Sequence, residues 1–69
     1  MGVKVDARGL SCPQPVMLTR KALQAATGPV VVLLDTVTQV QGCTRAAEKL
    51  GWQAACEEKG GVFELTLRK

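Results

Sequence analysis

The chain has 69 residues, with nine Lys and Arg against six Asp and Glu, and it contains no histidine. This length predicts one small domain over residues 1–69, with too little core to enclose a deep catalytic cavity. The missing imidazole excludes Ser-His and Cys-His dyads and histidine metal sites, so any chemistry must rest on cysteine, carboxylates or cations.

The chain is predicted to open with a strand and a helix. Val3 and Val5 alternate with a lysine, and the turn-prone stretch 6–11 ends this strand. Pro13 suits the first position of a helix, where its missing N–H leaves no bond unmade. The glycine and proline that follow predict the end of the helix near Ala26.

The middle of the chain predicts a buried strand and a second helix. Val30–Leu34 is a continuous aliphatic run, typical of a central strand covered on both faces, and it is expected to be parallel to the first strand. The second helix is expected over about residues 39–50, capped by Thr38 and stopped by Gly51. Gly42 inside it costs about 1 kcal/mol relative to alanine.

The last part of the chain predicts a hairpin. Residues 52–58 and Val62–Arg68 flank Lys59-Gly60-Gly61, and the second segment alternates apolar and polar side chains. The order βαβαββ predicts an α/β fold, a two-layer sandwich with a mixed four-stranded sheet and two helices on one face. The other face of the sheet would stay partly uncovered, which favours a monomer or a weak homodimer.

The sequence Cys12-Pro13-Gln14-Pro15 is the feature that carries chemistry. It places a thiol at a helix N-terminus, where unpaired N–H groups and the helix dipole favour an anion, so a lowered pKa is predicted for Cys12. Arg8 in the preceding loop is expected to add a second positive field, and the two prolines to stiffen the turn. The alternative is a cysteine that caps the helix or packs as a small hydrophobe.

The other two cysteines are expected to be structural. Three cysteines at wide spacing fit neither a disulfide framework nor the paired motifs of zinc and redox sites, so at least one thiol should be free. Cys43 lies on the apolar face of the second helix, and Cys56 shares a strand face with Trp52. We expect the side chains of Cys43, Cys56 and Trp52 to lie in the core. We expect no metal site and no cofactor.

The first helix is predicted to present a docking face. A helical wheel places on the buried half Val16, Leu18, Ala22, Leu23, Ala25 and Ala26. The other half contains Met17, Arg20, Lys21 and Gln24. Met17 is then an exposed apolar side chain ringed by cations, which suits a partner with an acidic rim, whereas the alternative is a solvated face with one stray methionine. Asp35 is expected to cap a turn, or else to orient the Cys12 loop or a partner's cation.

The composition narrows the kinds of partner. The cations are spread along the chain rather than gathered in one run, and only Trp52 and Phe63 are aromatic, so nucleic-acid binding is not expected. No stretch approaches the roughly 20 apolar residues that span a bilayer, and the first residues have no apolar signal region. These observations predict a cytoplasmic protein without a membrane partner.

Residues 6–16 resemble the signature of the TusA/SirA-like sulfur-carrier family. The positions that match the motif include Arg8, Gly9, Cys12, Pro13 and Pro15. The resemblance continues through Leu18–Leu23 and covers nearly the whole chain. The second half, including Arg45–Trp52, is most similar to the amino-terminal domain of the YedF-like branch.

The resemblance implies a carrier that accepts sulfane sulfur as a persulfide on Cys12, from a cysteine desulfurase or a rhodanese-like donor, and passes it to a downstream acceptor protein. It implies a relay protein rather than a multiple-turnover enzyme, and it places Met17 and Arg20 at positions of partner contact. The alternative is a noncatalytic interaction or regulatory module that docks through the same surface. The acceptor pathway stays open among transfer RNA thiolation, molybdenum cofactor, sulfur oxidation and selenium metabolism.

Overall fold

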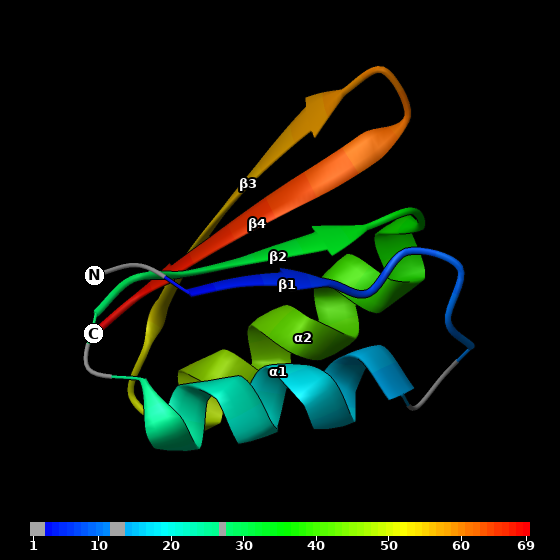
Figure 1. The fold of residues 1–69 in the computed structure, drawn as a ribbon. Helices are drawn as coiled ribbons and strands as arrows, with labels where there is room; N and C mark the ends of the chain where they lie inside the picture. The colour runs from blue at the N-terminus through cyan, green and yellow to red at the C-terminus, as the bar shows by residue number, and fades with distance from the viewer. Residues whose placement is uncertain (1–2, 12–13, 27) are drawn as a thin grey trace.

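The sheet and the helices form two layers in the computed structural model, which describes residues 3–11, 14–26 and 28–69 (Figure 1). The elements are β1 (Val3–Asp6), α1 (Gln14–Ala25), β2 (Val30–Leu34), α2 (Val37–Lys49), β3 (Gln53–Lys59) and β4 (Val62–Arg68). The strand order is β1-β2-β4-β3, with β1 parallel to β2 and the other pairs antiparallel. The predicted βαβαββ sandwich is therefore confirmed. Within the described ranges, neither helix is long and apolar enough to cross a membrane.

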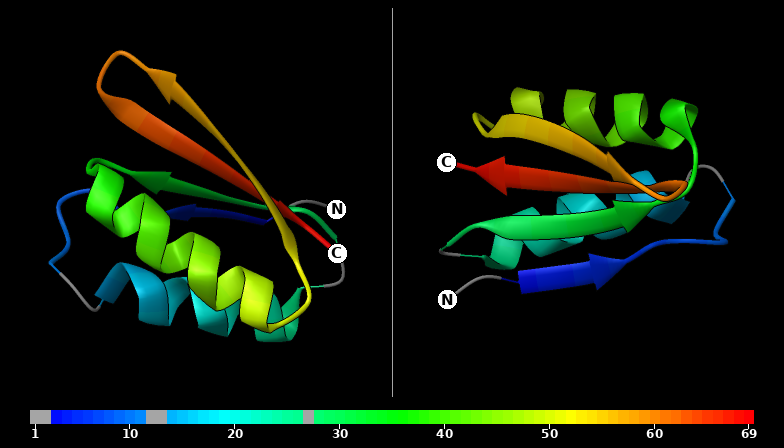
Figure 2. Two further views of the ribbon diagram at one scale, coloured as in Figure 1. Left: turned by 180° about the vertical axis from the view of Figure 1, so that it is seen from behind. Right: turned by 90° about the horizontal axis from the view of Figure 1, so that it is seen from above.

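The core lies between the sheet and the two helices. Its fully buried strand residues are Val30, Val32, Leu34, Leu65 and Leu67. Val31 and Leu33, between them on β2, are only half-buried. Both helices lie on the same face of the sheet in each view of Figure 2, so only alternate residues of β2 face them. The prediction that β2 is covered on both faces was wrong.

The second helix begins earlier than the sequence pattern predicted. Its N-cap is Thr36, whose hydroxyl oxygen accepts a hydrogen bond from the Gln39 N–H at 3.2 Å. Thr36 and Gln39 have the same Thr-x-x-Gln spacing as the pair beginning at Thr38, and the strand already ends at Leu34, so the earlier threonine is the one that meets the first free N–H groups. For α1, the predicted end near Ala26 is confirmed, because the Ala26 N–H still bonds to the Ala22 carbonyl.

The two helices pack closely where Gly42 faces α1. A Cβ atom at Gly42 would lie 3.0 Å from Cγ2 of Val16, closer than an ordinary van der Waals contact, so Val16 would have to shift to admit a larger residue. Thr19 is fully buried nearby; its hydroxyl donates to the Pro15 carbonyl at 2.8 Å, and its oxygen lies 3.2 Å from the Cys43 sulfur. The glycine that weakens the helix pattern is therefore explained by close packing, and the predicted burial of Cys43 is confirmed.

Trp52 and Cys56, which were both predicted to lie in the core, have different surroundings in the structure. Trp52 is 5% exposed, as predicted for a core residue, but Cys56 is exposed. Cys56 pairs with the buried Leu65 and so points to the helix side of the sheet. However, β3 is an edge strand, and its turn end rises away from the helices (Figures 1 and 2), so the helices leave this position exposed. The prediction of a buried Cys56 was wrong.

Candidate functional site

The loop after β1 is hydrogen-bonded to the turn that precedes α2. The Gly9 N–H donates to Oδ2 of Asp35 at 2.8 Å, across 26 positions of the sequence. Gly9 has a φ of 77°, a conformation that side chains disfavour, which explains a glycine here. Of the alternatives for Asp35, the structure therefore supports the orientation of the loop that leads to Cys12.

A second hydrogen bond fixes the next residue of the same loop. The side-chain amide of Gln39 donates from Nε2 to the Leu10 carbonyl oxygen at 2.6 Å. Gln39 thus binds the loop instead of folding back onto the helix cap, as a capping box would require. Sequence reasoning missed this residue, because a glutamine three positions after a threonine carries no signal for a loop that is distant in sequence.

Arg8 is paired with a carboxylate rather than isolated. Its Nε and Nη2 atoms donate to Oδ1 and Oδ2 of Asp6 at 2.9 and 2.8 Å. The hydrogen bonds from Arg8 lower the pKa of Asp6 to about 2. Because the Asp6 charge offsets that of Arg8, the positive field expected from Arg8 is weakened, and its support of a thiolate stays a prediction.

Cys12 and Pro13 lie outside the described residues, so the cap position and the lowered pKa of the thiol stay predictions. The structure describes the residues on either side of them. The Gln14 N–H donates to the Ser11 carbonyl at 2.9 Å, and α1 begins at Gln14. The Pro15 side chain is buried in the first turn of α1. The motif therefore lies, in sequence, between a loop with two long-range hydrogen bonds and a helix anchored by a buried proline.

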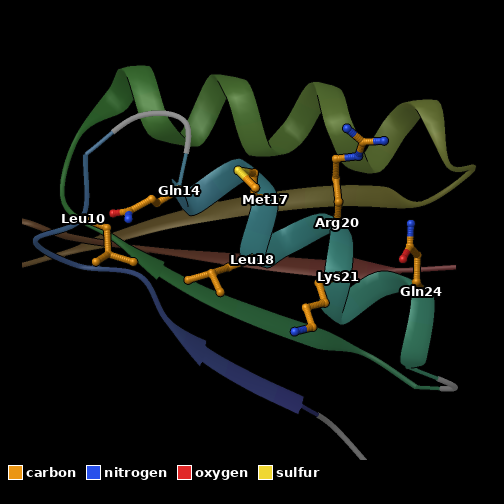
Figure 3. Close-up of a pocket in the computed structure, with 7 residues that line it drawn as sticks. All are labelled: Leu10, Gln14, Met17, Leu18, Arg20, Lys21 and Gln24. Carbon is orange, nitrogen blue, oxygen red and sulfur yellow. The ribbon is translucent and has the colours of Figure 1, made fainter.

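A shallow pocket of about 630 Å³ lies along the outer side of α1 (Figure 3). The described residues that line it are Leu10, Gln14, Met17, Leu18, Arg20, Lys21 and Gln24. Met17 is 61% exposed, so its predicted exposure is confirmed. We call this surface, from Leu10 to Gln24, the α1 pocket. It includes Leu10 of the preceding loop and Gln14 of the motif, and it combines apolar side chains with two cations.

The helical wheel assigned two residues of α1 to the wrong half. Leu18 is 38% exposed and lines the α1 pocket, and Ala25 is also exposed. Thr19 instead lies in the buried stripe with Pro15 and Leu23, spaced four residues apart. The reason is that α1 contacts both the sheet and α2, and a buried hydroxyl that bonds to its own helix carries no apolar signal in the sequence.

Two comparisons with known proteins identify relatives of the chain. Residues 3–69 match the protein family described as Sulfurtransferase TusA. The crystal structure of a SirA-like protein from Desulfitobacterium hafniense is 38% identical and superposes with a TM-score of 0.90, covering 99% of this chain and 96% of that one. A comparison with curated proteins found no significant match.

Proposed function

Because the chain belongs to the TusA sulfurtransferase family, a family of sulfur carriers, we propose that it accepts sulfur as a persulfide on Cys12 and relays it to an acceptor protein. The observation that carries the proposal is the family match, which runs through Cys12-Pro13-Gln14-Pro15. The resemblance predicted from the sequence is thereby confirmed at the level of the family, while the YedF-like branch stays a prediction.

The chemistry of loading requires one thiolate and no cofactor. The Cys12 thiolate attacks the outer sulfur of a donor persulfide, the donor S–S bond breaks, and the donor sulfur leaves as a thiolate. Cys12 then bears the sulfane sulfur, which an acceptor thiolate removes by the same displacement. The N–H groups of the first turn of α1 would stabilise the thiolate, since the chain has no imidazole.

Two hydrogen bonds that fix the loop before the motif support the proposal. Asp35 and Gln39 bind consecutive residues of the loop, Gly9 and Leu10, which are separated from the motif by Ser11 alone. A reactive group that is held on a rigid support loses less entropy when it meets the reacting partner. We therefore assign Asp35 and Gln39 as positioning residues, with Gly9, Pro13 and Pro15 shaping the turn.

The α1 pocket is the proposed contact surface for sulfur donors and acceptors. Met17 and Leu18 offer exposed apolar area, and Arg20 and Lys21 offer charge beside it. Neither cation forms an ion pair among the described residues, so both are available to an acidic partner. A cysteine desulfurase or a rhodanese-like protein is the proposed donor. We place the relay in the cytoplasm, where cysteines stay reduced.

Sulfur loading is tested by mass spectrometry. The protein is incubated with a cysteine desulfurase and cysteine, and the intact mass is expected to increase by one sulfur atom, which dithiothreitol removes. Cys12→Ser should abolish the increase completely. Cys56→Ser is the matched control, since it removes an exposed thiol on β3 that is not part of the motif, and it should load normally.

The alternative is a noncatalytic module that uses the α1 pocket for docking only. It predicts that Cys12→Ser binds partners as the wild type does and that no donor, including inorganic polysulfide, adds sulfur to Cys12. Absence of the added sulfur with a desulfurase, a rhodanese-like donor and polysulfide would rule out the carrier and favour this alternative.

A further inference from the structure

The charges of the molecule separate between its two layers, although they are spread evenly along the sequence. The charged residues of the helices are Arg20, Lys21, Arg45, Glu48 and Lys49. Outside the helices, five cations are balanced by five carboxylates. The whole net charge of +3 is therefore carried by the helix layer.

A second hollow, which adjoins the α1 pocket at Arg20, lies between the two helices and is lined by three of their cations. This interhelical groove has a volume of about 250 Å³, and Arg20, Arg45 and Lys49 line it. Figure 3 shows the Arg20 side chain extending from α1 towards α2. Gly42 also lines the groove, and its missing side chain lets the helices approach closely there.

The cations of the groove are not neutralised within the described part of the chain. The two ion pairs found there, Arg8 with Asp6 and Lys59 with Glu64, both belong to the sheet side. Glu48, the one carboxylate on α2, forms no ion pair with Arg45 or Lys49 in that part of the structure. The apolar part of the lining comes from Val16, Ala46 and Leu50, and Leu50 is 39% exposed.

We propose that the interhelical groove binds an acidic segment of a partner protein, with carboxylates on Arg20, Arg45 and Lys49 and an apolar side chain against Leu50. The proposal rests on the proposed function in one respect, since it extends the contact surface of a sulfur-relay partner. Arg20 lines both the groove and the α1 pocket, so the two surfaces are continuous. The partner would then be held by α2 as well as by the helix that follows Cys12.

The chemistry of the groove favours an acidic peptide over a nucleic acid. Single-stranded nucleic acids bind through aromatic stacking as well as charge, and neither helix contains an aromatic residue. Trp52 is buried, and Phe63 is half-buried on β4. The half-apolar lining instead suits a segment in which glutamate or aspartate alternates with leucine-like residues.

The test measures binding of a fluorescent twelve-residue peptide of glutamate and leucine by anisotropy. The charge reversal R45E/K49E is compared with K4E/R68E, which makes the same charge change at exposed positions of the sheet layer. We expect R45E/K49E to raise the Kd at least tenfold and K4E/R68E less than twofold, with binding to the wild type weakening as salt increases. The milder pair R45Q/K49Q removes the two charges without reversing them, and it should raise the Kd at least threefold.

Three outcomes would overturn the groove proposal. They are equal weakening by R45E/K49E and K4E/R68E, no binding of the peptide to the wild type, and binding of an oligouridine as tight as that of the peptide with the same loss in R45E/K49E. The Cys12→Ser protein should bind the peptide as the wild type does. A failure of sulfur loading on Cys12 would therefore refute the proposed function and leave the peptide-binding result unchanged. A failure of peptide binding would refute the groove proposal and leave sulfur loading unchanged.

Discussion

The helix layer and the open face of the sheet differ in both packing and charge. The helices cover one face of the sheet, bury alternate residues of β2 and carry the net positive charge. On the open face, Val31 and Leu33 are half-buried and the surrounding charges cancel. The difference teaches that one side of this small protein provides both its stability and its candidate contact surface, because both depend on the packing of α1 and α2.

Two adjacent leucines of β2 offer the strongest test of this difference. Leu34 faces the helices and is fully buried, whereas Leu33 faces outwards. We expect Leu34→Ala to lower the free energy of unfolding by about 3–5 kcal/mol, since it leaves a core cavity. Leu33→Ala should cost about 1 kcal/mol, in proportion to its smaller buried area. Urea denaturation measures both, and equal costs would mean that the open face is covered, for example in a dimer.

Gly42 tests the contact between the helices. We expect Gly42→Val to cost about 1–3 kcal/mol of unfolding free energy, because its side chain would overlap Val16. The same change should weaken binding of the acidic peptide, since Gly42 lines the interhelical groove. Gly42→Ala is the control, with a smaller cost because the gain in helix propensity offsets the closer contact. Thermal unfolding with an unchanged midpoint for Gly42→Val would contradict the close packing.

Arg20 tests the proposed contact surface without disturbing the core. Arg20→Glu should raise the carrier's KM in desulfurase-dependent sulfur loading about tenfold, equivalent to about 1.4 kcal/mol. The free energy of unfolding should change little, because Arg20 is exposed and lies in no ion pair of the described structure. Lys4→Glu, the same charge change on the sheet, is the control. Loading kinetics that are the same for both variants would remove Arg20 from the contact surface.

Asp35 tests how the turn before α2 holds the loop at Gly9, which leads in sequence to Cys12. Asp35→Asn replaces a charged acceptor for the Gly9 N–H and should cost about 1 kcal/mol. Hydrogen exchange at the Gly9 amide should become faster, and sulfur loading should slow in kcat rather than KM. Asp35→Glu is a second variant, which keeps the charge but changes the reach. A change in stability without faster exchange at Gly9 would show that Asp35 acts elsewhere.

The smallest effect is expected at Asp6, on the exposed side of β1. Arg8 lowers the pKa of Asp6 to about 2, below its ordinary value of 3.8. The contribution of the Asp6 carboxylate to stability is therefore present above pH 4, and it is lost as the pH falls towards 2. NMR titration of the carboxyl carbon should give the low value, and Arg8→Gln should move it towards 3.8. Between pH 5 and 8 this pair should cause no change in stability.

The two cysteines that were expected in the core show where sequence patterns succeed and fail. Cys43 lies on a regular helical stripe that faces the other helix, so the pattern alone predicted its burial. Cys56 lies on the correct face of β3, but alternation along a strand does not reveal that the strand forms an edge of the sheet. Partial desolvation of its sulfur, together with Glu58, raises the pKa of Cys56, so this exposed thiol is expected to react slowly at neutral pH.

The sequence by itself determined the order of the elements and the position of the Cys12-Pro13-Gln14-Pro15 motif. Proline, glycine and aliphatic runs act locally on the backbone, and the signature around Cys12 is contiguous in the chain. Only the tertiary structure decided that Asp35 and Gln39 hold Gly9 and Leu10, since hydrogen bonds across many positions leave no periodic trace. The gathering of scattered cations on one layer likewise required the packing of two helices, because charge along a chain becomes charge on a surface only after folding.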